Sequence, residues 1–205
     1  HPDKDHVAGL TEVVKQYNVE NVLWTGVEKD TRVSKEWKEA LEQEQKEGAN
    51  IALARVPQNI KWSSGNFGEF VEILSPKEAD RKQAGITNDT SIVAKLVFYR
   101  TSFLFPGDIT KNMENELVAK RLDLNADVLK IAHHGSKSSS TGSFLAAVSP
   151  ELGVMSVGRK NRYGHPHDEI VERFGRLHIP LLRTDENGDI VIRSDGKSFW
   201  VNVKK

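Results

Sequence analysis

Apolar runs of strand length alternate with amphipathic segments of helical length in the second half of this chain, and that order limits the folds it can adopt. Three helices are predicted there, at about 111–121, near 143–148 and at about 168–177. Two strands are predicted between them, at 128–132 and 153–157. Strands interleaved with helices in this way favour an α/β fold, in which helices cover the outside of the sheets.

The remaining segments extend the same pattern. Two further helices are predicted at 7–17 and 34–47, the second of them very polar. Strands are predicted at 51–55, 70–74, 91–99, 103–105, 181–183, 190–193 and 199–203, and residues 21–24 form a short apolar run. Asn187-Gly188 and Asp195-Gly196 are strong turn signals, so we expect the chain to end in a meander of hairpins. Because no repeat or linker is visible, a single domain over residues 1–205 is the simpler prediction.

Composition excludes several kinds of site. The chain contains no cysteine, so any metal must bind to His, Asp, Glu or Asn. The 29 basic and 29 acidic residues cancel, which argues against a whole-surface electrostatic grip on nucleic acid but not against a local basic rim. No apolar run approaches the ~18 residues of a transmembrane helix. Since the first residue is His rather than Met, we expect the natural N-terminus, with any anchor or export signal, to be missing.

Six of the seven histidines fall in three short motifs. The first motif, His1-Pro2-Asp3-Lys4-Asp5-His6, offers four possible ligands and runs directly into a predicted helix. Two carboxylates placed this close together are costly unless a cation neutralises them. The alternative is a solvated polar terminus without a ligand.

Two later motifs follow apolar strands. The adjacent His133 and His134 end one strand, and His165 and His167 come after the next. Asp108 also follows a strand, within Pro106-Gly107-Asp108, and so reaches a sheet edge, where sites on α/β scaffolds gather. Random placement would scatter the histidines, so their grouping favours a metal site with two ions. Such a site activates water between the ions and clamps the oxygens of a displacement at carbon or phosphorus.

Basic residues accompany the later motifs. They are Lys130, Lys137, Arg159, Lys160 and Arg162. A rim of this kind suits an anionic substrate such as a phosphodiester. The competing interpretation is chance, because charged residues make up 28% of the chain.

Taken in order, these motifs resemble a known family. His1–Leu10 resembles the His-x-His-x-Asp-His signature of the metallo-β-lactamase superfamily, with Asp3 at the second position. The stretches 88–93, 105–108, 129–136, 156–166 and 182–188 look like the hydrolase domain of ComEC-type DNA-uptake proteins. The resemblance implies an α/β fold, namely an αββα four-layer sandwich with a dinuclear site at the sheet edge. The family's opening strands are absent here, so it also implies a domain that is incomplete at its N-terminus.

The resemblance implies a role for each motif residue. His1 and Asp3 would bind one metal, Asp5 and His6 the other, and Asp108 would bridge them. His134 and His165 would be the later ligands, with His133 and Asp5 as catalytic residues; His133 would touch the substrate or shuttle a proton. His133 and His134 are interchangeable in that assignment. The residues expected to bind substrate are Lys130, Ser136, Arg162 and Tyr163. An oxygen ligand at Asp3 makes the site harder, so manganese rivals zinc as the divalent ion.

Three functions follow from this resemblance. The first is a phosphodiesterase or nuclease that acts on DNA through two metals and a metal-bound hydroxide, as in ComEC-type DNA uptake and competence. The second is a phosphorylcholine-esterase-like or other small phosphoester hydrolase, and the third is a non-catalytic binding module. The first implies a membrane-associated or extracytoplasmic location, with a membrane channel or anchor outside this chain.

Overall fold

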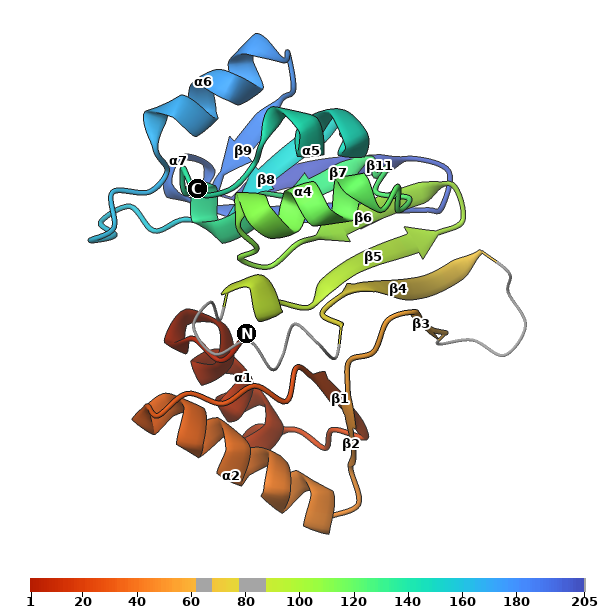
Figure 1. Ribbon diagram of the computed structural model, residues 1–205, viewed down its shortest axis with the longest axis vertical. Helices are drawn as coiled ribbons and strands as arrows, with labels where there is room; N and C mark the ends of the chain where they lie inside the picture. Colours follow the sequence, from red (N-terminus) through yellow and green to blue (C-terminus); the bar gives the residue numbers. More distant parts are fainter. Residues whose placement is uncertain (62–67, 78–87, 205) are drawn as a thin grey trace.

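The centre of the structure, a computed structural model that describes residues 1–61, 68–77 and 88–204, is a mixed β-sheet (Figure 1). Its spatial order follows the chain: β3 (Gln58–Ile60), β4 (Glu69–Ser75), β5 (Val93–Phe98), β6 (Thr101–Phe105), β7 (Val128–Lys130), β8 (Leu152–Met155) and β9 (Leu181–Arg183). The pairs from β3 to β6 are antiparallel, and those from β6 to β9 are parallel. The carboxyl ends of β6 to β9 therefore meet at one edge.

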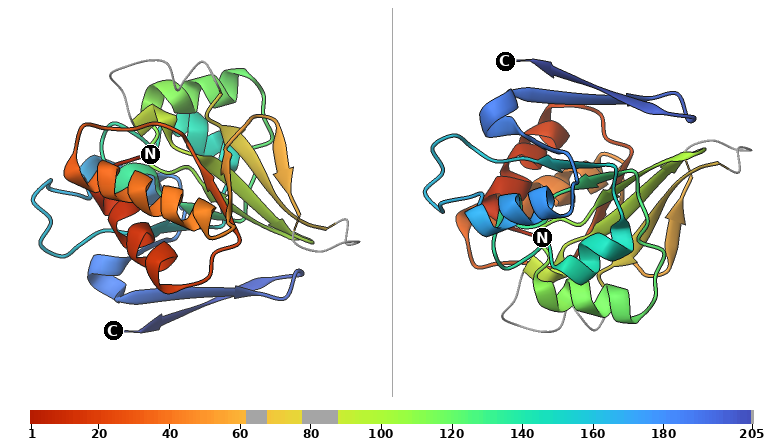
Figure 2. Two further views of the ribbon diagram at one scale, coloured as in Figure 1. Left: turned by 90° about the horizontal axis from the view of Figure 1, so that it is seen from below. Right: turned by 90° about the horizontal axis from the view of Figure 1, so that it is seen from above.

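Helical crossovers produce the parallel half, because two parallel neighbours cannot be joined by a tight hairpin. The crossover helices are α4 (Lys111–Ala119), α5 (Gly142–Val148) and α6 (Asp168–Arg176). Thr110 and Thr141 cap the first two by accepting hydrogen bonds from backbone N–H groups of the first turn. The helices pack on one face of the sheet (Figure 2). The largest side chains of that core include Leu104, Ile109, Leu129, Phe144, Ile170 and Phe174.

A smaller layer is formed by the beginning of the chain. Helices α1 (Lys4–Gln16) and α2 (Arg32–Lys46) pack beside a parallel pair, β1 (Asn21–Trp24) and β2 (Asn50–Leu53). Its buried core consists of Val7, Val14, Trp37, Ala40 and Leu41. This layer lies at the lower end of the view in Figure 1, below the seven-stranded sheet.

The chain ends in an antiparallel hairpin of β10 (Asp189–Ser194) and β11 (Phe199–Lys204), with Asp195-Gly196 in its turn. The hairpin lies across the face of the large sheet that the crossover helices leave open (Figure 2). Its turn is tied to the β5–β6 connection, where the Arg100 N–H donates to the Gly196 carbonyl at 2.8 Å. The predicted hairpin at Asp195-Gly196 is therefore confirmed.

The second predicted hairpin turn, at Asn187-Gly188, is wrong. These residues end a helical turn, α7 (Thr184–Asn187), that carries the chain from the large sheet to the hairpin. The physical reason is a local hydrogen bond: the Asn187 side chain accepts from the Arg183 N–H at 2.9 Å, which closes a helical turn in place of a hairpin turn. β9 and β10 consequently lie in different sheets.

The α/β class and almost every predicted element are confirmed, with shifted ends. Strand β3 was not predicted, because the polar sequence Gln58-Asn59-Ile60 has no strand pattern. Helix α1 begins at Lys4 rather than Val7, since the Asp3 carbonyl accepts from the N–H groups of His6 and Val7 at 3.0 Å. Among the described residues, the structure contains no helix that is both long and apolar enough to cross a membrane.

The approach of β8 to α6 yields a stability prediction. A Cβ on Gly153 would lie 2.7 Å from the Phe174 ring and 3.1 Å from the Ile131 side chain. Gly153→Ala should lower the free energy of unfolding by about 1–3 kcal/mol through overpacking, measured by urea denaturation. Gly175→Ala is the control, because an added Cβ there meets nothing within 4 Å and α6 favours alanine. Equal destabilisation by both substitutions would contradict this packing.

Candidate metal centre

The predicted site residues come together at the carboxyl edge of the parallel strands. Asp108 follows β6, His133 and His134 follow β7, and the loop 156–167 follows β8. Neighbouring parallel strands deliver these loops to the same edge of the sheet, which is where sites on open α/β sheets form. The first turn of α1 adds His6 from the smaller layer. The site therefore lies between the two layers of the molecule.

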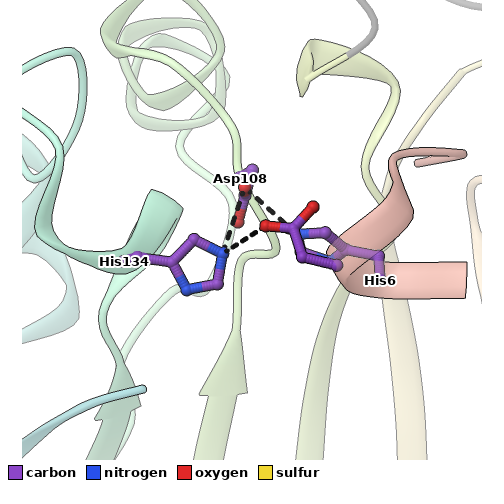
Figure 3. A group of neighbouring side chains, drawn as sticks. His6, Asp108 and His134 are labelled. Atoms are coloured by element: carbon purple, nitrogen blue, oxygen red, sulfur yellow. Dashed lines mark ion pairs between the residues drawn. The ribbon is translucent and has the colours of Figure 1, made fainter. Parts of the chain in front are cut away.

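A buried carboxylate is at the middle of the site. Asp108 is 3% exposed, and its Oδ2 lies 3.1 Å from His6 Nε2, 3.5 Å from His1 Nε2 and 3.6 Å from His134 Nε2. Asp5 Oδ2 completes the arrangement at 3.3 Å from His134 Nε2. Figure 3 shows the side chains of Asp108, His6 and His134 pointing toward one another from three different parts of the chain.

This arrangement fits a bound cation. One donor atom each from Asp5, His6, Asp108 and His134 lies within 4.8 Å of all the others. Within the described residues, several buried atoms here have no hydrogen-bond partner: His1 Nδ1, His1 Nε2, His6 Nε2, Asp108 Oδ1 and His134 Nε2. A buried polar atom without a partner costs about 1–3 kcal/mol, so a cluster of them calls for a ligand that satisfies all of them together. Imidazole nitrogens and carboxylate oxygens are ligands that zinc and manganese accept.

The protonation states suit this purpose. Burial raises the pKa of Asp108, but the imidazoles of His1, His6 and His134 around the carboxylate outweigh burial and hold that pKa well below its usual range. Burial lowers the pKa of His133 and of His165, which favours the neutral form of both imidazoles. Asp108 is thus a carboxylate, with the uncharged rings of His133 and His165 beside the centre.

The turn after β7 separates the two adjacent histidines by unusual backbone geometry. His133, His134 and Gly135 all have positive φ, at 48°, 53° and 81°. Each non-glycine residue in this region costs roughly 1–2 kcal/mol, and such strain gathers at functional sites. A residue larger than glycine does not fit at position 135, because its Cβ would lie 2.7 Å from Met155 Sδ and 2.8 Å from Pro166 Cβ.

Hydrogen bonds give the two imidazoles different roles. His134 Nδ1 donates to the Ser156 carbonyl at 2.8 Å, since a carbonyl can only accept. That bond leaves the unprotonated Nε2 directed at Asp5 and Asp108, as a metal ligand requires. His133 Nδ1 lies 3.4 Å from Asn88 Nδ2, a group that can only donate, and 3.1 Å from Ser138 Oγ. With the amide oriented in this way, the proton of neutral His133 is on Nε2, 4.0 Å from Asp108 Oδ2.

The Gly107-Asp108 turn is fixed by its neighbours in the same way. The Asp108 N–H donates to Ser91 Oγ at 3.1 Å, and Ser91 Oγ donates to the Asn88 carbonyl at 2.6 Å. The His133 N–H donates to the Gly107 carbonyl at 3.2 Å, which links the β6 and β7 loops. The backbone around the carboxylate is therefore held from both sides.

Three predicted ligands, His1, Asp3 and His165, lie beside the group of Asp5, His6, Asp108 and His134 rather than in it. Asp3 Oδ1 forms an ion pair with Lys29, a residue that sequence reasoning missed, and lies 3.6 Å from His1 Nδ1. The His165 ring is centred 5.7 Å from that of His133 and forms part of the wall of the site.

The predicted substrate-binding residues are more dispersed. Tyr163 lines a hollow of about 340 Å³ that reaches Asp5 and His134, and Arg162 stands next to it in the same loop. Lys130 is half-buried and lines a hollow beside the C-terminal hairpin, and burial lowers its pKa against the opposing charges of Asp108 and Asp5. Ser136 is only 7% exposed, and its Oγ forms a hydrogen bond with Ser138 Oγ at 3.0 Å. Its side chain therefore stabilises the loop that carries His133.

Sequence reasoning also missed the residues that orient the histidines. Ser138 and Ser156 gave no signal, because one lies in a serine-rich loop and the other acts through its backbone carbonyl. Asn88 was detectable, since it opens the stretch 88–93 that carries part of the family resemblance.

Comparison with known proteins agrees with this geometry. The family model described as "Metallo-beta-lactamase superfamily" matches residues 1–159. ComE operon protein 3 of Bacillus subtilis (strain 168) is 29% identical over 197 residues, covering 94% of this chain and 24% of that protein. Competence protein ComA of Neisseria gonorrhoeae is 39% identical over 132 residues, covering 64% of this chain and 18% of that protein. Recombination protein 2 of Haemophilus influenzae (strain ATCC 51907 / DSM 11121 / KW20 / Rd) is 28% identical over 192 residues, covering 93% of this chain and 21% of that protein.

These matches confirm the predicted resemblance to ComEC-type competence proteins and the predicted fold class. The chain spans only about a quarter of the length of the first of these relatives and less of the other two. The family model covers well over half of the chain and includes every residue of the four-residue group. The chain therefore belongs to the metallo-β-lactamase superfamily.

Proposed function

We propose that this chain is a metal-dependent phosphodiesterase that cleaves DNA at a two-metal centre around Asp108. The observation that carries the proposal is the set of buried donor atoms without partners, which converges on a carboxylate at the edge of the sheet. The choice of DNA rests on the relatives, whose names refer to competence and recombination. The same centre would otherwise serve a small phosphoester.

In this proposal the ligands divide between two ions. Asp5, His6 and His134 would hold one, His1 and Asp3 would hold the other, and Asp108 would serve both. The first set is supported by the close approach of its donor atoms, and the second by the 3.5 Å separation of His1 Nε2 and Asp108 Oδ2. Lys29 would have to release one oxygen of Asp3. When bound, zinc or manganese ions activate water and polarise a phosphoryl oxygen.

One of the chain's own residues supplies a hydrogen-bond donor. His133 carries a hydrogen on Nε2, faces the centre and is kept neutral by burial. Ser138 and Asn88 hold its other nitrogen, so the ring is oriented without binding metal. We assign His133 to hydrogen bonding from Nε2–H to a phosphoryl oxygen, which would stabilise the negative charge that develops there.

Measurements of metal binding should distinguish the roles of the adjacent His133 and His134. Titration of metal-free protein with manganese or zinc in a calorimeter should show about two ions per chain. Asp108→Asn and His134→Ala should weaken binding by at least about tenfold, because each removes a donor from the group. His133→Ala should bind as the wild type does. His178→Asn is the control, since His178 lies at the end of α6 with a positive φ that Asn tolerates. Undiminished binding by His134→Ala would contradict the assignment.

Activity tests the role of His133. With manganese or zinc present, His133→Ala should reduce DNA cleavage by about 10²–10³-fold, the usual contribution of a donor positioned at developing charge, while metal content stays unchanged. Cleavage is measured on a labelled oligonucleotide and, in parallel, on bis(p-nitrophenyl) phosphate. Turnover of the small ester alone would leave a hydrolase of small phosphoesters. A metal-loaded wild type that cleaves neither substrate would overturn the proposal.

A further inference from the structure

The loop between β8 and α6 projects from the body of the molecule beside the metal centre (Figures 1 and 2). From residue 156 to 167 it contains three basic residues, Arg159, Lys160 and Arg162, and no acidic one. The chain as a whole has a formal net charge of zero, so this segment is a local concentration of positive charge next to a site that takes anions.

One side chain holds the loop in a single shape. Asn161 Nδ2 donates to the carbonyls of Gly158 at 2.9 Å and His165 at 2.5 Å, and Asn161 Oδ1 accepts from the N–H groups of Tyr163 at 3.2 Å and His165 at 2.9 Å. Four hydrogen bonds around one amide leave this turn little freedom. The rings that it carries are therefore placed before any ligand arrives, which lowers the entropy cost of binding.

The most exposed of those rings is that of Tyr163, at 65%. One face is backed by His165, whose ring is inclined by 26° with the centroids 5.9 Å apart. The Arg162 guanidinium lies 5.4 Å from the Tyr163 ring centre. A large aromatic ring held in solvent by a rigid loop contributes little to packing, so its use must be sought outside the chain.

The position of the ring identifies that use. Tyr163 and His165 line the same 340 Å³ hollow as Asp5 and His134 of the metal centre. A phosphate at the centre would thus have its own nucleoside beside the ring. Aromatic side chains with neighbouring arginines are the usual stacking surfaces for bases of single strands.

We propose that Tyr163 is a stacking platform for an unpaired base next to the scissile phosphate, with Arg162 attracting the backbone. This inference rests on the proposed function and deepens it, because it selects single-stranded nucleic acid as the substrate. A base within a duplex is already stacked on both faces and cannot reach the ring. Every base has a face that can stack, so sequence preference should be weak.

The test compares two oligonucleotides of equal length, one with bases and one abasic with the same phosphodiesters. Tyr163→Ala should weaken binding and raise KM on the strand with bases by about 5- to 150-fold, the range measured for one stacked base. On the abasic strand it should match the wild type. Tyr163→Phe keeps the ring and should behave as the wild type on both strands, which separates stacking from loss of the hydroxyl.

The outcomes distinguish this inference from the proposed function. Equal behaviour of Tyr163→Ala and wild type on the strand with bases, or equal losses on both strands, overturns the platform while leaving the phosphodiesterase intact. If the wild type binds the strand but does not cleave it, and Tyr163→Ala binds less tightly, the platform stands and the proposed activity falls. A wild type that neither binds nor cleaves the strand overturns both.

Discussion

The burial of the Asp108 carboxylate among imidazoles is the constraint on which the site depends. A buried charge is stable only when it is neutralised, and here the partners come from both layers of the molecule. His134 comes from the large sheet, and His1 and His6 come from the start of the chain. Their remaining donor atoms have no partner within the described structure. A cation at this point would both complete the site and join the two layers.

The sheet topology explains why these residues meet at all. Parallel strands β6, β7 and β8 end at one edge, and each carries a different group there: a carboxylate, a pair of imidazoles and a basic loop with an exposed tyrosine. The left-handed backbone at His133 and His134 then separates two adjacent side chains. In the proposed function, one imidazole would be a metal ligand and its neighbour a hydrogen-bond donor to the substrate, both from the end of a single strand.

The elements and the location of the site were accessible from the sequence, because both depend on local patterns. Alternation of apolar runs marks strands and helices, and polar residues just after parallel strands mark the active edge. What was missed depends on contacts between distant segments. Lys29 reaches Asp3, and Asn88 reaches His133 across 45 positions. The prediction of a hairpin turn at Asn187-Gly188 was wrong because the Asn187 side chain accepts a hydrogen bond from the Arg183 N–H. A hydropathy pattern does not reveal such a local hydrogen bond.

The most direct test of the central claim is the thermal unfolding of the metal-free chain with and without manganese or zinc. Ions that bind the folded centre stabilise it by mass action, by about 2.7 kcal/mol at a free concentration 100 times Kd. We expect a rise in Tm that a chelator reverses and that Asp108→Asn largely abolishes. An unchanged Tm in the wild type, or the same rise in Asp108→Asn, would contradict a cation site at the buried carboxylate.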